Sequence, residues 1–134
     1  MRAARSLAAM VAPPRVVAIV DDDASVRIAL LGLMRAAAIA ARAFASAEEF
    51  LQSGIEAETA CVVADVRMPG MSGLELQAEL RSRSPGLPVI FITAHWNAEI
   101  HARAMAAGAV RVFQKPFDDQ SLLDAIREAV RSSP

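Results

Sequence analysis

The sequence predicts an α/β fold, in which a single domain is built on an open, doubly wound parallel sheet with helices on both faces. Five short apolar stretches alternate along the chain with five stretches of helical periodicity, a (βα)5 pattern. The strongest of the apolar stretches are continuous, which is typical of strands buried on both faces. The chain has 134 residues, 54% of them hydrophobic, so it has room for one compact domain with a full core.

The first strand is predicted at residues 16–20, a β-branched run that stops at Asp21-Asp22-Asp23. A weaker strand at 41–44 leads into a helix over 46–52, where Ser46 as N-cap and Glu49 at the third helical position suggest a capping box. Gly54 ends that helix. Between these two strands a helix begins at Ala24, because apolar residues recur at three- and four-residue steps: Val26, Leu30, Leu33, Met34 and Ala37.

The third strand, residues 60–64, runs into Asp65, and Pro69-Gly70 marks the loop that follows it. Ser72 caps the next helix, which ends before Pro85-Gly86. A strand at 88–92 then leads to Thr93.

The last part of the chain contains a helix over 97–107, stopped by Gly108, and a strand over 110–113. Lys115-Pro116 separates that strand from a final helix over 118–131. This helix carries an apolar stripe that we expect to face the sheet: Leu122, Leu123, Ile126 and Val130.

Composition narrows the class of protein. We expect residues 1–14 to be a flexible leader, in preference to a signal peptide because Pro13-Pro14 interrupts a short Ala-rich run; residues 15–131 form the domain and 132–134 a tail. No apolar stretch approaches the roughly 20 residues of a membrane span, and a net charge of −1 argues against nucleic acid as a partner of the whole surface. Cys61 is the only cysteine, so we predict a buried thiol and a reducing, cytoplasmic location.

The polar residues at the strand ends indicate the chemistry. In parallel α/β sheets the ligand site lies outside the carboxyl ends of the strands, where Asp21, Asp22, Asp65, Thr93 and Lys115 all fall. Three carboxylates at one edge repel one another unless a hard cation neutralises them, and oxygen ligands suit Mg²⁺ or Mn²⁺. An aspartate nucleophile, metal carboxylates, a hydroxyl and a lysine together fit an acyl-phosphate site.

The sequence resembles the receiver domain of bacterial two-component response regulators over residues 15–131. The phrases 44–50 and 91–95 are most similar to the receivers that often precede a LuxR-type DNA-binding domain. The resemblance implies a flavodoxin-like sheet with strand order 2-1-3-4-5. It is carried by Val20-Asp21-Asp22-Asp23, Asp65-Val66-Arg67-Met68-Pro69-Gly70-Met71-Ser72-Gly73-Leu74-Glu75, Ile92-Thr93-Ala94, Gly108-Ala109 and Lys115-Pro116-Phe117.

This resemblance also implies a role for each site residue. Asp65 would be the phosphoacceptor, with Lys115 and Thr93 contacting the phosphoryl group. Asp22 would bind the metal directly, Asp21 would assist through water, and the backbone carbonyl of Arg67 would be a further ligand alongside Asp65. The Lys115-Pro116 bond would be cis, and the phosphoryl donor would be a sensor histidine kinase or a phosphotransfer protein. The domain would catalyse only its own phosphorylation and dephosphorylation.

Two departures bear on the switch. Receivers usually carry Phe or Tyr three residues before the lysine, but Val112 stands there, with Phe113 beside it. Trp96 replaces a small residue near the site, and we interpret it as a partly exposed packing residue. Arg67 and His95 lie two residues after Asp65 and Thr93, and we expect them to tune the phosphate lifetime. The switched surface would be the helix 97–107, the strand 110–113 and the helix 118–131, which could also form a homodimer.

Two other functions remain open. Asp21-Asp22-Asp23-Ala24-Ser25 also resembles the opening motif of haloacid-dehalogenase-type phosphatases, in which Asp21 would be the nucleophile and Asp23 the acid/base. The chain could instead be a receiver that works as an interaction module without phosphate, which Val112 mildly favours. We expect either a stand-alone receiver or the N-terminal part of a longer regulator, and the sequence does not indicate what the switch acts on.

Overall fold

The computed structural model describes residues 15–132; the predicted leader at 1–14 and the end of the predicted tail lie outside the described residues. The described residues form one parallel sheet of five strands in the order β2-β1-β3-β4-β5, as predicted. The strands are β1 Val16–Val20, β2 Ala41–Phe44, β3 Thr59–Asp65, β4 Val89–Thr93 and β5 Arg111–Gln114. The α-helices are α2 Ala24–Ala36, α3 Ala47–Gln52, α4 Gly73–Arg83, α5 Ala98–Ala106 and α6 Asp119–Ser132, and a short 3-10 helix, η1 Glu56–Glu58, precedes β3.

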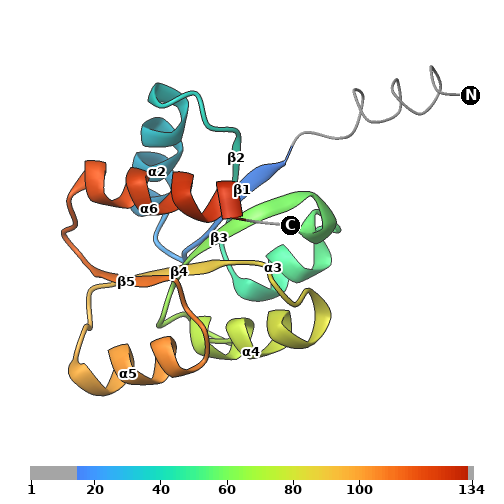
Figure 1. Ribbon diagram of the computed structural model, residues 1–134, viewed down its shortest axis with the longest axis vertical. Helices are drawn as coiled ribbons and strands as arrows, with labels where there is room; N and C mark the ends of the chain where they lie inside the picture. The colour runs from blue at the N-terminus through green and yellow to red at the C-terminus, as the bar shows by residue number, and fades with distance from the viewer. Residues whose placement is uncertain (1–14, 133–134) are drawn as a thin grey trace, which may run out of the picture.

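The sheet separates two helical layers, with α2 and α6 on one face and α3, α4 and α5 on the other (Figure 1). The three central strands, β1, β3 and β4, are almost wholly buried, because helices cover both of their faces. Side chains of β3 therefore alternate between two cores. Val62 and Ala64 pack with the α3–α5 layer, whereas Cys61 and Val63 pack with α2 and α6.

Ser46 and Ser72 cap α3 and α4, as predicted. The Ser46 hydroxyl accepts the backbone N–H of Glu49 at 3.0 Å, but the reciprocal capping box forms between Ser72 and Glu75. Asn97, predicted as the first residue of a helix, is instead the N-cap of α5. These caps satisfy N–H groups that have no partner within the helix, and such a cap typically contributes about 1 kcal/mol.

The predicted stripe on α6 is wrong at one residue. Val130 is 37% exposed, and Ala129 is buried. At 3.6 residues per turn, Val130 lies between Ile126 and Leu123 around the helix axis, and both of those side chains are buried. The predicted face is therefore right, and Val130 is exposed because it stands near the end of α6.

Gly73 allows α4 to lie close to the end of β3. A Cβ atom on this glycine would clash with the backbone oxygen of Asp65, closer than any side chain tolerates. Its N–H donates to the carbonyl of Val66 at 2.9 Å and closes the base of the loop that joins β3 to α4. Gly73 thus holds the start of the helix directly against the residue at the centre of the predicted site.

Every helix in residues 15–132 is too short or too polar to cross a bilayer.

Candidate functional site

The predicted site residues meet at the carboxyl edge of the sheet. Carboxylate oxygens of Asp21, Asp22 and Asp65 lie within 4.8 Å of one another, although the three residues come from the ends of β1 and β3. β1 and β3 are hydrogen-bonded neighbours in register, with Val20 opposite Ala64, so both strands end at the same level. The sheet topology, rather than any local sequence signal, brings the three carboxylates together.

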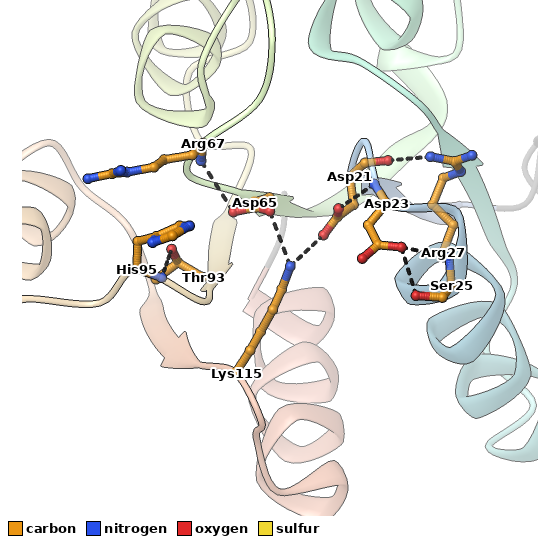
Figure 2. A network of polar contacts seen from close by, with 9 residues as sticks. All are labelled: Asp21, Asp23, Ser25, Arg27, Asp65, Arg67, Thr93, His95 and Lys115. Carbon is orange, nitrogen blue, oxygen red and sulfur yellow. Dashed lines mark hydrogen bonds and ion pairs between the residues drawn. The ribbon is translucent and has the colours of Figure 1, made fainter.

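Lys115 lies between two of these carboxylates (Figure 2). Its Nζ donates to Asp21 Oδ2 at 3.0 Å and to Asp65 Oδ2 at 3.1 Å. It is the only lysine in the sequence, whose other cationic side chains are arginines. An ammonium is a compact point charge that can serve two oxygens at once. The backbone bond between Lys115 and Pro116 is cis, as the resemblance implied.

Burial and charge oppose one another in this cluster. Burial raises the pKa of Asp21 above its ordinary value, more than the Asp23 N–H and Lys115 lower it. For Lys115, burial alone would lower the pKa, but the hydrogen bonds and charges of Asp21 and Asp65 outweigh it, so the pKa is raised. The lysine therefore stays charged and compensates part of the carboxylate charge. Three carboxylates against one ammonium still leave an excess of negative charge.

Thr93 and His95 lie on the next strand end, beside Asp65 (Figure 2). Thr93 is fully buried; its hydroxyl accepts the N–H of His95 at 3.0 Å, and its carbonyl accepts the N–H of Lys115 at 2.8 Å. The end of β4 thus holds the backbone of the lysine in place. The N–H of Arg67 donates to Asp65 Oδ1 at 3.2 Å, while its side chain extends away from that carboxylate.

The predicted modulators occupy different depths. His95 and Arg67 are exposed at the mouth of the site, whereas Val112 is buried in the core between the sheet and the α3–α5 layer. Phe113 faces the opposite core, under α6, with the guanidinium of Arg111 4.4 Å from its ring centre. Trp96 is 40% exposed and its ring lies 5.8 Å from that of His101, as expected of a partly exposed packing residue.

Asp23 serves the helix rather than the site. Its carboxylate accepts the N–H and the hydroxyl of Ser25, at 2.9 and 2.7 Å, and so caps α2. These hydrogen bonds lower its pKa. The Asp23 side chain binds Ser25 and is not part of the cluster formed by Asp21, Asp22 and Asp65. The structure therefore gives no support to the phosphatase alternative, which requires Asp23 as an acid/base.

Two residues near the site were given no role by the sequence analysis. Nη1 of Arg27 donates to the carbonyl of Asp21 at 2.7 Å and so holds the acidic loop from the first turns of α2 (Figure 2). Glu48, in α3, accepts the N–H of Met71 in the loop after Asp65. An arginine in the first turn of the helix, six residues after the strand-end Asp21, could have been noticed in the sequence. The Glu48 contact spans 23 residues and has no such local signature.

The donor set fits a hard divalent cation. All three side chains offer oxygen, their oxygens lie within 4.8 Å of one another, and their charge exceeds that of Lys115. Asp22 is exposed, so one ligand faces solvent, from which hydrated Mg²⁺ would arrive.

Fold and site together define a class: a doubly wound α/β domain whose strand ends carry a cluster of three aspartates closed by a lysine. Comparison with known proteins identifies it. Residues 17–127 match the family model of the response regulator receiver domain. The chain belongs to this family, the receiver domains of two-component response regulators.

Named relatives agree. The chain is 47% identical over 111 residues to nodulation protein W of Bradyrhizobium diazoefficiens, covering 83% of this chain and 49% of that protein. It is 44% identical over 112 residues to the transcriptional regulatory protein TdiR of Thauera aromatica, covering 84% of this chain and 49% of TdiR. The chain thus spans about half the length of these curated relatives. The predicted resemblance to receivers of transcriptional regulators is confirmed.

Solved structures of response regulators share this fold. The response regulator StyR superposes with a TM-score of 0.82 at 43% identity, over 90% of this chain and 61% of StyR. The structure of FixJ-N superposes with a TM-score of 0.78 at 35% identity, over 89% of this chain and 95% of that one. The predicted fold class is confirmed.

Proposed function

We propose that this receiver accepts a phosphoryl group on Asp65 from a phosphohistidine of a sensor histidine kinase or phosphotransfer protein. A carboxylate oxygen of Asp65 attacks the phosphorus, the phosphorus–nitrogen bond breaks, and the protonated ring leaves as neutral imidazole. The observation that carries the proposal is the position of Asp65: it ends a buried strand, its side chain is 11% exposed, and an ammonium lies 3.1 Å from one of its carboxylate oxygens. A sensor histidine kinase takes its phosphoryl group from ATP, so the proposal implies that this receiver lies in the cytoplasm.

The surrounding residues supply binding and charge. We propose that Asp21, Asp22, Asp65 and the backbone carbonyl of Arg67 hold Mg²⁺ (or Mn²⁺). When bound, this ion would supply positive charge for the transferring phosphoryl oxygens. The ammonium of Lys115, which now binds Asp65 Oδ2, would bind an oxygen of the phosphoryl group once Asp65 carries it. The Thr93 hydroxyl lies on the neighbouring strand end. The domain would act on no substrate other than its own Asp65.

Arg67 and His95 would set how long the phosphate lasts. Both flank Asp65 at the exposed mouth of the site, where a side chain can admit or exclude the water that hydrolyses an acyl phosphate. Arg67→Ala and His95→Ala are expected to change the dephosphorylation rate of phospho-Asp65 several-fold; two unchanged rates would contradict this role.

The switched surface would be the face formed by α5, β5 and α6, which could also form a homodimer. On α5 it exposes small and apolar side chains, Ala98, Ala102 and Met105, with few charges. Val112 has no aromatic ring, so it cannot make the inward ring movement that is usual at this position in receivers. This favours a second candidate, a receiver whose interactions do not depend on phosphate.

Phosphate labelling tests the proposal. Incubation with acetyl phosphate and Mg²⁺ should place an acid-labile phosphate on Asp65, seen by mass spectrometry and absent from Asp65→Asn. Asp21→Asn should label more slowly, but still on Asp65. A label that survives Asp65→Asn and disappears in Asp21→Asn would refute the proposal. Size-exclusion chromatography with and without beryllium fluoride and Mg²⁺ then separates the two candidates, because only a phosphate-driven switch changes its association.

A further inference from the structure

Glu48 in the first turn of α3 holds the loop that follows Asp65. Its Oε2 accepts the backbone N–H of Met71 at 2.8 Å. Glu48 belongs to the phrase 44–50 and Met71 to the phrase 65–75, two of the stretches that carry the family resemblance. No role in the proposed chemistry accounts for Glu48, yet this hydrogen bond joins the two stretches directly.

The loop, residues 66–72, is fastened at both ends by its own neighbours. At its base the N–H of Gly73 donates to the Val66 carbonyl at 2.9 Å, and at its exit Ser72 and Glu75 form the capping box. The contact from Glu48 reaches Met71, directly before the exit of the loop, and it comes from a different helix. It therefore ties the loop to α3, which the two local sets of bonds do not do.

The local structure is shaped to receive this carboxylate. Gly70 has a φ of +75°, a conformation that favours glycine, and a Cβ built there would lie 2.5 Å from Glu48 Oε2. The N–H of Met71 lowers the pKa of Glu48, so the side chain is ionised at neutral pH. A charge-assisted hydrogen bond of this kind is roughly twice as strong as a neutral one.

The loop also carries Arg67, whose N–H is bonded to Asp65 and whose carbonyl is the remaining ligand in the proposed metal site. We propose that Glu48 is a positioning residue for that site: by holding the Met71 N–H it sets the path of loop 66–72, and through it the placement of the Arg67 carbonyl. This inference rests on the proposed function, because it concerns Mg²⁺ binding by the same residues. Glu48 itself is not a ligand.

Three substitutions at Glu48 separate the effect of side-chain length from the effect of its negative charge. Glu48→Gln keeps an oxygen at the same reach but loses the charge; Glu48→Asp keeps the charge but is one methylene shorter; Glu48→Ala loses both. Glu49→Ala is the matched control, since it removes the neighbouring exposed carboxylate from the same helical turn. Mg²⁺ titrations followed by amide NMR spectra of the whole chain give the affinity, and hydrogen exchange of the Met71 amide reports its bond to Glu48.

The Mg²⁺ dissociation constant should rise about tenfold in Glu48→Ala and Glu48→Asp, the lower end of the loss seen when outer-shell partners of metal sites are removed. In Glu48→Gln it should rise only about two- to threefold, because a neutral acceptor still holds the N–H. Exchange of the Met71 amide should accelerate in the Ala and Asp variants and stay slow in Gln. Glu49→Ala should match the unmodified chain in both measurements.

Unmodified protein that binds Mg²⁺, with affinity unchanged in all three Glu48 variants, would overturn the inference alone. Affinity retained in Glu48→Asp but lost in Glu48→Gln would also overturn it, because the effect would then be one of charge at a distance. Unmodified protein that fails to bind Mg²⁺ would overturn the proposed metal site, and the inference with it. The Asp and Gln variants keep the comparison valid if Glu48→Ala fails to fold.

Discussion

Lys115→Met removes the one cation that compensates the aspartate cluster while keeping an unbranched side chain. The ammonium is within 3.1 Å of two carboxylates, and the side chains of Lys115, Asp21 and Asp65 are 18%, 0% and 11% exposed. Methionine fills a similar volume, so the core beneath the site should repack little. The substitution therefore tests charge rather than packing.

The loss of stability expected for Lys115→Met depends on how deeply its ion pairs are buried. Removing one partner of a buried ion pair costs about 3–5 kcal/mol, since the other charge is left uncompensated. Asp21 has no exposure, but water reaches Lys115 and Asp65, so we expect roughly 2–4 kcal/mol here. The loss should shrink as the pH falls. Burial already raises the pKa of Asp21, so protons bind the folded variant before the unfolded chain and relieve the repulsion.

Urea denaturation without divalent cations measures this loss, with Arg127→Met on the exposed side of α6 as the control for removing one positive charge. The double variant Asp21→Asn/Lys115→Met should recover at least about 1 kcal/mol over Lys115→Met, because residues in direct contact are not additive. Saturating Mg²⁺ should reduce the difference in free energy of unfolding between Lys115→Met and the unmodified chain, since an ion that binds only the folded state stabilises it. A loss below about 0.5 kcal/mol, or strict additivity, would refute this account of the cluster.

Three further outcomes are expected. Asp23→Ala should lower the urea midpoint through loss of the α2 cap, with Mg²⁺ affinity within about twofold of the unmodified chain; a tenfold weaker affinity would make Asp23 part of the site. Gly73→Ala should displace the end of β3, lowering the melting temperature and slowing acetyl phosphate labelling of Asp65; normal labelling would show that α4 can shift without cost. Burial raises the pKa of Cys61 to about 12 from an ordinary 9.0, so the native thiol should resist thiol reagents at pH 8 and react on unfolding. Above pH 9 unfolding releases the Cys61 proton, so stability should fall as the pH rises towards 12, and a pH series with Cys61→Ala lacking that slope checks the sign.

The strands were predictable because burial on both faces leaves a plain local signature. The run at β1 matched the structure residue for residue, and β3 was predicted one residue short at each end. The caps Ser46 and Ser72 were equally predictable, because each bonds to backbone only three residues away. The stripe of α6 was wrong at Val130 because hydrophobicity alone does not say where the helix leaves the sheet.

Local sequence patterns were enough to predict the alternation of strands and helices and the resemblance that the comparisons confirmed. They also placed five polar residues at strand ends: Asp21, Asp22, Asp65, Thr93 and Lys115. These predictions were possible because periodicity, capping and strand-end polarity act over a few residues. The fold alone shows which carboxylates Lys115 bridges and that Glu48 reaches Met71. Those contacts join residues as many as 94 positions apart, and strand order and helix packing alone bring such residues into range.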